Sequence, residues 1–270
     1  MKNSKFSVLL SLYDNEKPAN LMECLLSLQN QTFPASEVVI IYDGVINKKL
    51  EQVVDFFKNK LPIVIIKIEK NVGLGKALNH GLKFCKYELI ARMDTDDICL
   101  PTRFEKQIKY LSENPHVNIL GSNIVEFDNT TKEKRDKNLP GKLDDIIKFS
   151  LMKNPINHMS VMFYKKDIFD IGGYKHHLYM EDYNLWLRAI KNRLVIENIQ
   201  EQLLLVRVDS DMLNRRRGLP YIKSEFLLFK LKMELSLFKK TEIITSFFIR
   251  VLMRIIPVSL LSIVYKFSRK

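Results

Sequence analysis

Three carboxylates stand within four positions in the segment ARMDTDD, residues 91–97, directly after an apolar run that is typical of a buried strand. Because carboxylates held so close together repel one another, such a cluster usually has a cation to bind. An ordinary Asp-rich turn explains the same spacing, since Pro101 opens a predicted helix and Asp97 or a neighbour can cap it. The spacing alone leaves both interpretations open.

A second acidic pair, Glu181-Asp182, stands at the start of a predicted helix that runs to Lys191 and contains Trp186, the only tryptophan. Acidic residues favour the N-terminus of a helix through the helix dipole, and the same dipole holds a carboxylate ionised. The pair therefore suits a simple helix start, a site that needs a charged carboxylate, or both together.

The elements that position these residues begin with an alternation of strands and helices over the first 120 residues. This pattern predicts an α/β fold with a mostly parallel sheet and helices on both faces. The strands are expected at Phe6–Tyr13, Glu37–Tyr42, Ile63–Ile68 and Glu88–Met93, and the helices at Pro18–Gln29, Lys48–Lys60, Gly73–Cys85 and Pro101–Glu113. Ligand sites in such sheets lie at the carboxyl ends of the strands, where Asp14, Asp43, Asn71 and the 91–97 cluster all fall.

The pattern loosens between Val117 and about Lys142, and the polar stretch 128–138 is predicted to be a loop or excursion. Beyond it we expect a strand at Ser160–Tyr164, a helix at Lys166–Ile171 and a last strand at Leu203–Val208. After residue 218 the composition changes to apolar and basic helices. We therefore predict one domain over residues 1–218, with halves at about 1–120 and 121–218, and a helical extension over 219–270.

The composition is that of a globular protein, with 46% hydrophobic and 27% charged residues in a chain of 270. The three scattered cysteines form neither a disulfide framework nor a metal knuckle and fit a reducing cytosol, and the N-terminus lacks an apolar signal core. A net charge of +12 suits nucleic acid, an anionic membrane or phosphorylated substrates, although lysines on solvated faces account for much of it.

Taken in order, these segments resemble a family 2 glycosyltransferase with the GT-A fold, of the bacterial surface-polysaccharide type. The resemblance runs from Phe6 to Gly218 and rests on FSVLLSLYDN, QTFPASEVVIIYDG, NVGLGKALNHG, ARMDTDD, the stretch 157–174 that ends in IGGY, MEDY and VRVDSDMLNRRRG. It implies a Rossmann-like nucleotide-sugar fold and inverting transfer of a sugar from a UDP-sugar to a hydroxyl of a lipid-diphosphate-linked saccharide. Mn²⁺ or Mg²⁺ is then the expected cofactor, because the diphosphate leaving group needs its charge neutralised.

On the donor side, the resemblance implies a role for residues from each strand end and from a basic segment. Asp94 and Asp96 form the DXD pattern that contacts ribose and metal, with Asp96 the more direct ligand, and Asp43 is expected at the uracil. The full set is Tyr13, Asp14, Asp43, Asn71, Gly73, Lys76, Asp94, Asp96, Arg207, Arg215 and Arg216. Asp43 also suits an ordinary turn before a glycine, Lys76 an exposed helix position, and the arginines a solvated or membrane-facing run. Guanidinium groups nevertheless match phosphate oxygens well.

On the acceptor side, inverting transfer needs a general base that takes the proton from the attacking hydroxyl. The resemblance assigns this role to Asp182, with Glu181 orienting the acceptor or the loop. The expected acceptor-binding residues are His158, Gly173, Tyr174 and Trp186, although His158 suits a core or turn position equally well.

The C-terminal segment 243–256 has an apolar stripe of helical period, with Glu242, Ser246, Arg250 and Arg254 on the opposite side. Two arginines near the middle of a membrane span would each cost about 2.5–3.5 kcal/mol, so a helix lying in the membrane interface is favoured. Flanking lysines suit anionic lipid headgroups. We therefore expect a cytoplasmic protein attached peripherally to the inner face of the cell membrane, with a helical appendage packed on the domain or on a second subunit as the alternative.

Two rival functions are less consistent with the sequence. A sugar nucleotidyltransferase also uses carboxylates and Mg²⁺, but residues 10–17 lack its Gly-rich, basic phosphate loop. A non-catalytic basic protein that binds membrane or nucleic acid leaves the ordered series Asp43, Asp94, Asp96 and Asp182 unexplained. No nucleic-acid partner is expected.

Overall fold

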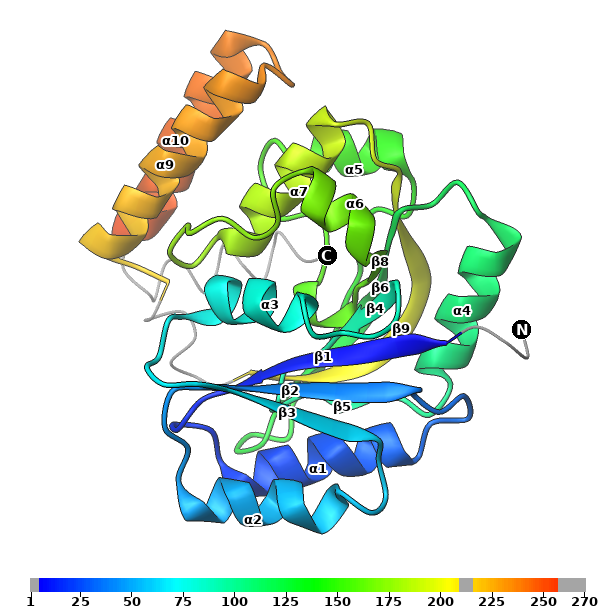
Figure 1. Cartoon of the computed structure of the whole chain (residues 1–270). Coiled ribbons are helices and arrows are strands. Elements are labelled where there is room, and N and C mark those ends of the chain that lie inside the picture. Colours follow the sequence, from blue (N-terminus) through cyan, green and yellow to red (C-terminus); the bar gives the residue numbers. More distant parts are fainter. Residues whose placement is uncertain (1–4, 209–215, 257–270) are drawn as a thin grey trace.

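The computed structural model describes residues 5–208 and 216–256. Within these residues nine strands form one sheet in the order β3-β2-β1-β4-β8-β6-β9-β5, with β7 beside β6. The strands are β1 (Phe6–Leu12), β2 (Glu37–Asp43), β3 (Ile63–Ile68), β4 (Leu89–Arg92), β5 (Ile98–Cys99), β6 (Ile119–Asp128), β7 (Lys134–Lys137), β8 (Met162–Tyr164) and β9 (Ile196–Val208). Figure 1 shows this sheet as the middle layer of the molecule, with helices on both faces.

The first half of the sheet is parallel, as the alternating pattern predicts. Val8 of β1 lies opposite Val38 of β2 and Ala91 of β4. Helices α1 (Pro18–Gln29) and α2 (Lys48–Phe57) cover one face, and α3 (Leu74–Leu82) lies on the other (Figure 1). Residues of β1 contribute to both cores, so both faces of the strand are buried and its sequence is apolar except for Ser7 and Ser11.

The second half of the sheet is mixed rather than parallel. β8 is antiparallel to both β4 and β6, β5 and β7 are antiparallel to their partners, and β6 and β9 are parallel to each other. The polar stretch after residue 128 forms a β6–β7 hairpin, and the last strand begins seven residues earlier than expected. The helices of this half are α4 (Arg103–Glu113), α5 (Leu143–Phe149), α6 (Lys165–Asp170) and α7 (Glu181–Lys191), of which α5 was not expected.

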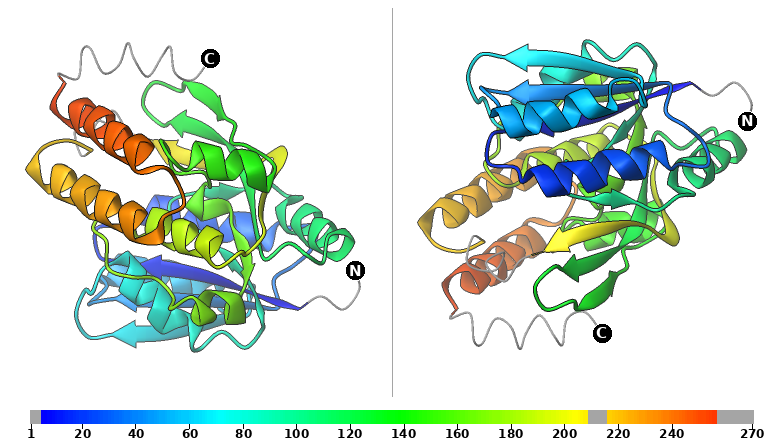
Figure 2. Two further views of the ribbon diagram at one scale, coloured as in Figure 1. Left: turned by 90° about the horizontal axis from the view of Figure 1, so that it is seen from above. Right: turned by 90° about the horizontal axis from the view of Figure 1, so that it is seen from below.

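The C-terminal helices α9 (Leu219–Leu235) and α10 (Lys240–Ile255) lie side by side and pack on the rest of the protein (Figures 1 and 2). A buried cluster joins α9 to α7 through Met180, Tyr183, Leu187, Tyr221 and Leu228. The packed appendage is therefore the alternative that the structure supports. The division of the chain at residue 218 stays a prediction.

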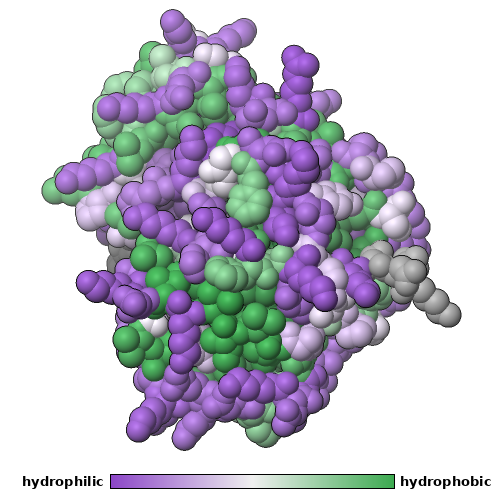
Figure 3. All heavy atoms as spheres, viewed as in Figure 1, coloured by the Kyte–Doolittle hydropathy of each residue, from purple (hydrophilic) through white to green (hydrophobic). Residues whose placement is uncertain are grey.

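Helix α10 turns part of its polar stripe toward the protein. Ser246 is 2% exposed, and Arg250 and Arg254 point inward, where both pair with the buried Glu225 of α9. Several apolar side chains face outward, with Phe248 66% exposed and Leu252 57% exposed, whereas Ile243 is buried. Figure 3 shows apolar surface over this hairpin at the upper left, interspersed with polar side chains. Among the described residues, no helix is both long enough and apolar enough to cross a bilayer.

Candidate active site

The three carboxylates that follow β4 converge on one point at the carboxyl edge of the sheet. One oxygen each of Asp94, Asp96 and Asp97 lies within 4.8 Å of the others. Burial and the neighbouring carboxylates raise the pKa of Asp96 to about 7 and raise that of Asp97 well above its usual range. The buried Oδ2 of Asp97 has no hydrogen-bond partner among the described residues. A hard divalent cation fits this donor set, because it would relieve the repulsion and satisfy the orphaned oxygen.

Arg92, the last residue of β4, supplies the positive charge of this site, and sequence reasoning missed it. The side chain is 1% exposed, and both of its terminal nitrogens bond to the Asp94 carboxylate, Nη1 at 2.8 Å from Oδ2. Such a fork holds one carboxylate in a fixed orientation. An arginine at the end of an otherwise apolar strand, two residues before the first aspartate, was the available signal.

Arg207, on β9, stabilises the loop of residues 94–97 through hydrogen bonds to Asp96 and Asp97. The Arg207 backbone N–H donates to Asp97 Oδ1 at 3.0 Å, and its Nε donates to the Asp96 carbonyl at 2.7 Å. Its Nη2 pairs with the half-exposed Glu23. Arg207 therefore supports the loop in this conformation, and its contact with the donor stays a prediction. Asp97 does not cap α4, whose N-cap is Thr102; it instead accepts from the Arg207 backbone within the loop.

Asp43, at the end of β2, anchors the loop that leads into α3. Its two carboxylate oxygens accept from the backbone N–H groups of Val72 at 2.7 Å and Gly73 at 3.1 Å. The Asn71 amide donates back to the Asp43 carbonyl. Gly44 permits this approach, since its φ is +94° and a Cβ there would lie 2.9 Å from the Asn71 nitrogen. Contact of Asp43 with a nucleoside stays a prediction.

The remaining donor-side residues surround this edge with varied exposure. Tyr13 is 45% exposed. Asp14 is also exposed, and it accepts from the backbone N–H of Asn47, the N-cap of α2, at 2.8 Å. Lys76 is exposed on α3 and forms no ion pair with a described residue. Arg216 is exposed, and Arg215 lies outside the described residues.

The second acidic group stands at the N-terminus of α7. Asp182 Oδ1 accepts from the Tyr183 backbone N–H at 2.7 Å, and Oδ2 accepts from Asn154 Nδ2 at 2.6 Å. Burial raises the pKa of Asp182, while these two hydrogen bonds oppose the rise. Burial and the charge of Asp182 raise the pKa of Glu181 to about 7. Asn154 is a second residue that sequence reasoning missed, and no signal in the sequence links it to Asp182.

The expected acceptor residues form a buried wall rather than an open surface. His158 Nε2 lies 2.8 Å from the Tyr174 hydroxyl, and burial together with Arg92 lowers the pKa of His158, so its ring is neutral. Trp186 is fully buried against the His158 ring. In this conformation Trp186 offers no exposed surface to an acceptor, and the expected contact stays a prediction. Gly173, with φ of +63°, lets the neighbouring backbone bond to the Asn79 side chain on α3.

Arg92 connects the two acidic groups electrostatically. The pKa values of Asp96, Asp97, Glu181 and Asp182 are all raised by burial, and the positive charge of Arg92 opposes each of these rises. A carboxylate cluster that could hold a cation and a separate acidic pair thus both lie within the electrostatic reach of one buried arginine. This pairing suits a reaction in which one group neutralises a leaving anion while another accepts a proton.

The parallel strand order β3-β2-β1-β4 continued by an antiparallel β8 is that of the GT-A fold. The solved structure of S. aureus TarS 1-349 in complex with UDP-GlcNAc superposes with a TM-score of 0.71 at 20% identity, covering 92% of this chain and 72% of that one. Residues 7–172 match the model described as glycosyl transferase family 2, and the chain belongs to that family. The resemblance drawn from the sequence is confirmed.

Two relatives are similar over nearly their whole length. The amylovoran biosynthesis glycosyltransferase AmsE of Erwinia amylovora is 50% identical over 268 residues, which is 98% of this chain and 99% of the relative. An Escherichia coli protein is 35% identical over 263 residues, 97% of this chain and 95% of the relative. Its name is UDP-Gal:alpha-D-GlcNAc-diphosphoundecaprenol beta-1,3-galactosyltransferase.

Proposed function

We propose that this protein transfers a sugar, with inversion, from a UDP-sugar to a hydroxyl of a lipid-diphosphate-linked saccharide in bacterial surface-polysaccharide assembly. The observation that carries the proposal is that one buried arginine, Arg92, pairs with the Asp94–Asp97 cluster and also acts electrostatically on Glu181 and Asp182. Similarity to a transferase named for a UDP-Gal donor and a diphosphoundecaprenol acceptor supports this substrate class, as does the relative named for amylovoran biosynthesis.

In the proposed reaction, Asp182 receives the proton of the acceptor hydroxyl as its oxygen attacks the anomeric carbon. The bond from that carbon to the diphosphate oxygen breaks on the opposite face, and UDP leaves. Asp182 suits this role because each carboxylate oxygen accepts one hydrogen bond and keeps a further lone pair. Glu181, at the same helix start, orients the acceptor or the loop.

Asp94 and Asp96 are the residues that would hold Mn²⁺ or Mg²⁺, with Asp97 adjacent. The ion would supply charge neutralisation at the diphosphate. Arg92 fixes Asp94, and Arg207 fixes the loop through the Asp96 carbonyl, so the chain presents its ligands in a prepared arrangement.

The test combines calorimetry with a transfer assay on a synthetic lipid-diphosphate sugar. UDP should bind the wild-type protein more tightly with Mn²⁺ than without, and Asp96→Ala should remove that difference while Asp55→Ala, on exposed α2, keeps it. Screening UDP-sugars identifies the donor. Release of pyrophosphate from a nucleoside triphosphate and a sugar phosphate, with no transfer to the lipid acceptor, would instead establish a nucleotidyltransferase.

We also propose that the protein is cytoplasmic and attaches to the inner face of the membrane through the outer side of the α9–α10 hairpin. This side carries an aromatic cluster of Phe226, Phe229, Phe247 and Phe248, together with exposed Leu252. Exposed lysines lie around it at positions 223, 230, 239 and 240. Apolar side chains with a basic rim match an anionic bilayer surface.

Vesicle co-sedimentation tests this attachment with the intact chain, because truncation of the hairpin would expose the buried cluster at Met180 and Tyr183. The double variant Phe248→Ser, Leu252→Ser should sediment less with anionic vesicles than the wild type. Phe56→Ser removes an equally exposed ring from α2 and serves as the control. Equal sedimentation of all three proteins would refute the proposed surface.

A further inference from the structure

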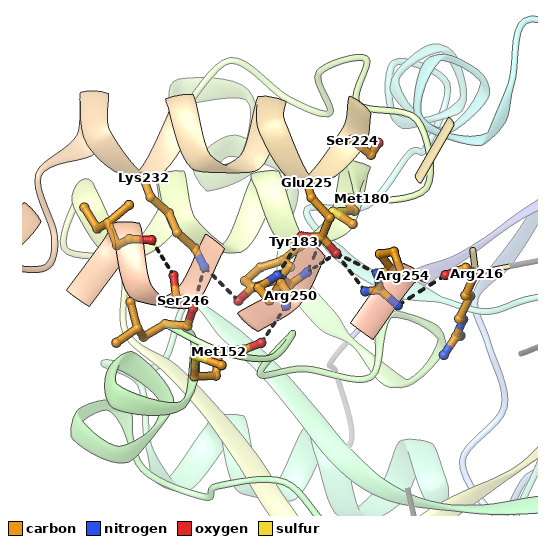
Figure 4. A network of polar contacts seen from close by, with 12 residues as sticks. Met152, Met180, Tyr183, Arg216, Ser224, Glu225, Lys232, Ser246, Arg250 and Arg254 are labelled. Atoms are coloured by element: carbon orange, nitrogen blue, oxygen red, sulfur yellow. Dashed lines mark hydrogen bonds and ion pairs between the residues drawn. The ribbon is translucent and has the colours of Figure 1, made fainter. Parts of the chain in front are cut away.

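The segment from Ser150 to Asn154 connects the C-terminal hairpin to the proposed base. Three successive backbone carbonyls of this segment accept hydrogen bonds, each from a different helix. The Tyr183 hydroxyl of α7 donates to the Ser150 carbonyl at 2.6 Å. Lys232 Nζ of α9 donates to the Leu151 carbonyl at 2.6 Å, and Arg250 Nη1 of α10 donates to the Met152 carbonyl at 2.5 Å. Figure 4 shows Lys232, Tyr183 and Arg250 grouped beside Met152.

One of the hairpin donors, Arg250, is itself held by a buried charge network. Glu225, 1% exposed, accepts from Arg250 Nε at 2.7 Å and from Arg254 Nη2 at 2.8 Å. The two arginines also lie over the rings of Tyr183 and Tyr221. Burying these charges costs desolvation free energy, so the network contributes mainly by fixing the positions of the side chains that form it. Here the arrangement that it fixes is the position of the Met152 carbonyl.

Two residues beyond that carbonyl, Asn154 reaches the proposed base. Its Nδ2 donates to Asp182 Oδ2 at 2.6 Å, and its Oδ1 accepts from the Ile156 backbone N–H. An amide that donates to one carboxylate oxygen restricts the rotation of the carboxyl group and stabilises its ionised form. The amide cannot rotate to face Asp182 with its oxygen without losing both bonds.

We propose that Asn154 is a positioning residue for Asp182, and that the α9–α10 hairpin holds Asn154 in place through the carbonyls of residues 151 and 152. The inference rests on the proposed function, in which Asp182 is the base. It gives the hairpin a second role besides the proposed attachment to the membrane. A displaced hairpin would release the carbonyls of residues 151 and 152, and the Asp182 carboxylate would lose its fixed orientation.

The charged and titratable groups that face Asp182 come from several elements, and all of them remain in the variants tested at Asn154. They are Glu181, Tyr183, Arg92, Lys137, Tyr174, His177 and Tyr221. The Asn154 hydrogen bond lowers the pKa of Asp182, so its loss raises that pKa. The base must be ionised, and the acidic limb of the kcat profile should therefore move to higher pH.

The experiment measures kcat, donor KM and the pH dependence of kcat for Asn154→Ala and Asn154→Asp. We expect kcat to fall by about tenfold or more, donor KM to stay within about twofold, and the acidic limb to move up by about one pH unit in Asn154→Ala. Asn154→Asp should move it further, because a second carboxylate then faces Asp182. Asn192→Ala removes a similar side chain from the exposed far end of α7 and should change none of these values.

The role of the hairpin is tested with Arg250→Met and Lys232→Met, each of which removes the donor to one carbonyl. Both should move the acidic limb in the same direction as Asn154→Ala. If Arg250→Met fails to fold, Lys232→Met still decides the point, since Met resembles the lysine in shape. An unmoved limb in folded Lys232→Met would overturn the role of the hairpin, and an unmoved limb in Asn154→Ala would overturn the whole inference. Asp182→Asn distinguishes failure of this inference from failure of the proposed function, because near-normal transfer in that variant would refute Asp182 as the general base.

Discussion

The carboxylate cluster should destabilise the protein when no cation is present, and Asp96→Asn should relieve that cost. Asp94, Asp96 and Asp97 lie within 4.8 Å of one another, and Arg92 pairs with Asp94 alone. The pKa of Asp96 is raised from its ordinary 3.8 to about 7, so the folded, metal-free protein binds more protons than the unfolded chain between these values. Its stability therefore falls as pH rises from about 4 through about 7 and levels off above that range.

The size of the effect follows from the same pKa values. The difference between 3.8 and about 7 corresponds to about 4 kcal/mol at most. Because Asp96 is partly exposed and shares its titration with the neighbouring carboxylates, we expect about half of this, or about 2 kcal/mol. For a chain of this size that corresponds to a rise in Tm of about 4–8 °C for Asp96→Asn.

Thermal unfolding in the presence of a chelator measures this difference at about pH 5 and about pH 8.5. The gain should be full at the higher pH and about a third as large at the lower, because at about pH 5 the carboxyl is protonated in the folded protein but already ionised in the unfolded chain. Asp55→Asn, an exposed residue of α2, should be near neutral at both. Added Mn²⁺ should stabilise the wild type and not Asp96→Asn. A gain of equal size at both pH values, or a loss at the higher one, would refute the reasoning.

Three further predictions concern residues whose surroundings the structure defines. Asp43→Asn replaces one of the two oxygens that accept from the N–H groups of Val72 and Gly73 with a donor NH2 group. UDP affinity measured by calorimetry should therefore fall by about tenfold, and an unchanged Kd would remove Asp43 from the donor site. Glu225→Gln leaves Arg250 and Arg254 without their partner and should lower the free energy of unfolding in urea by about 3–5 kcal/mol, against less than about 0.5 for exposed Glu234→Gln. Trp186→Phe should lower Tm yet leave acceptor KM within about twofold, because the ring is fully buried; a large rise in KM at unchanged Tm would contradict this.

The parallel half of the fold could be predicted because its signals are local. Each strand from Phe6 to Arg92 is a short apolar run that ends in turn residues, and the helices between the strands have a clear period. The mixed half was less predictable. Its antiparallel pairs join segments far apart in the chain, such as β5 with β9, and no local pattern specifies a partner at that distance. Helix α5 has only seven residues, too few for a clear period.

The sequence by itself determined the family, the carboxylate cluster and the acidic start of α7, because residue type and spacing carry that information. Only the tertiary structure decided what each side chain contacts. Arg207 braces the loop since Glu23 and the Asp96 carbonyl occupy its guanidinium, and Asn154 reaches Asp182 from 28 positions away. The same holds for α10. Periodicity shows which residues share a face, but a partner from another element decides which face is covered. The buried Glu225 pairs with the two arginines on the inner side of α10, and apolar residues such as Phe248 and Leu252 stay exposed.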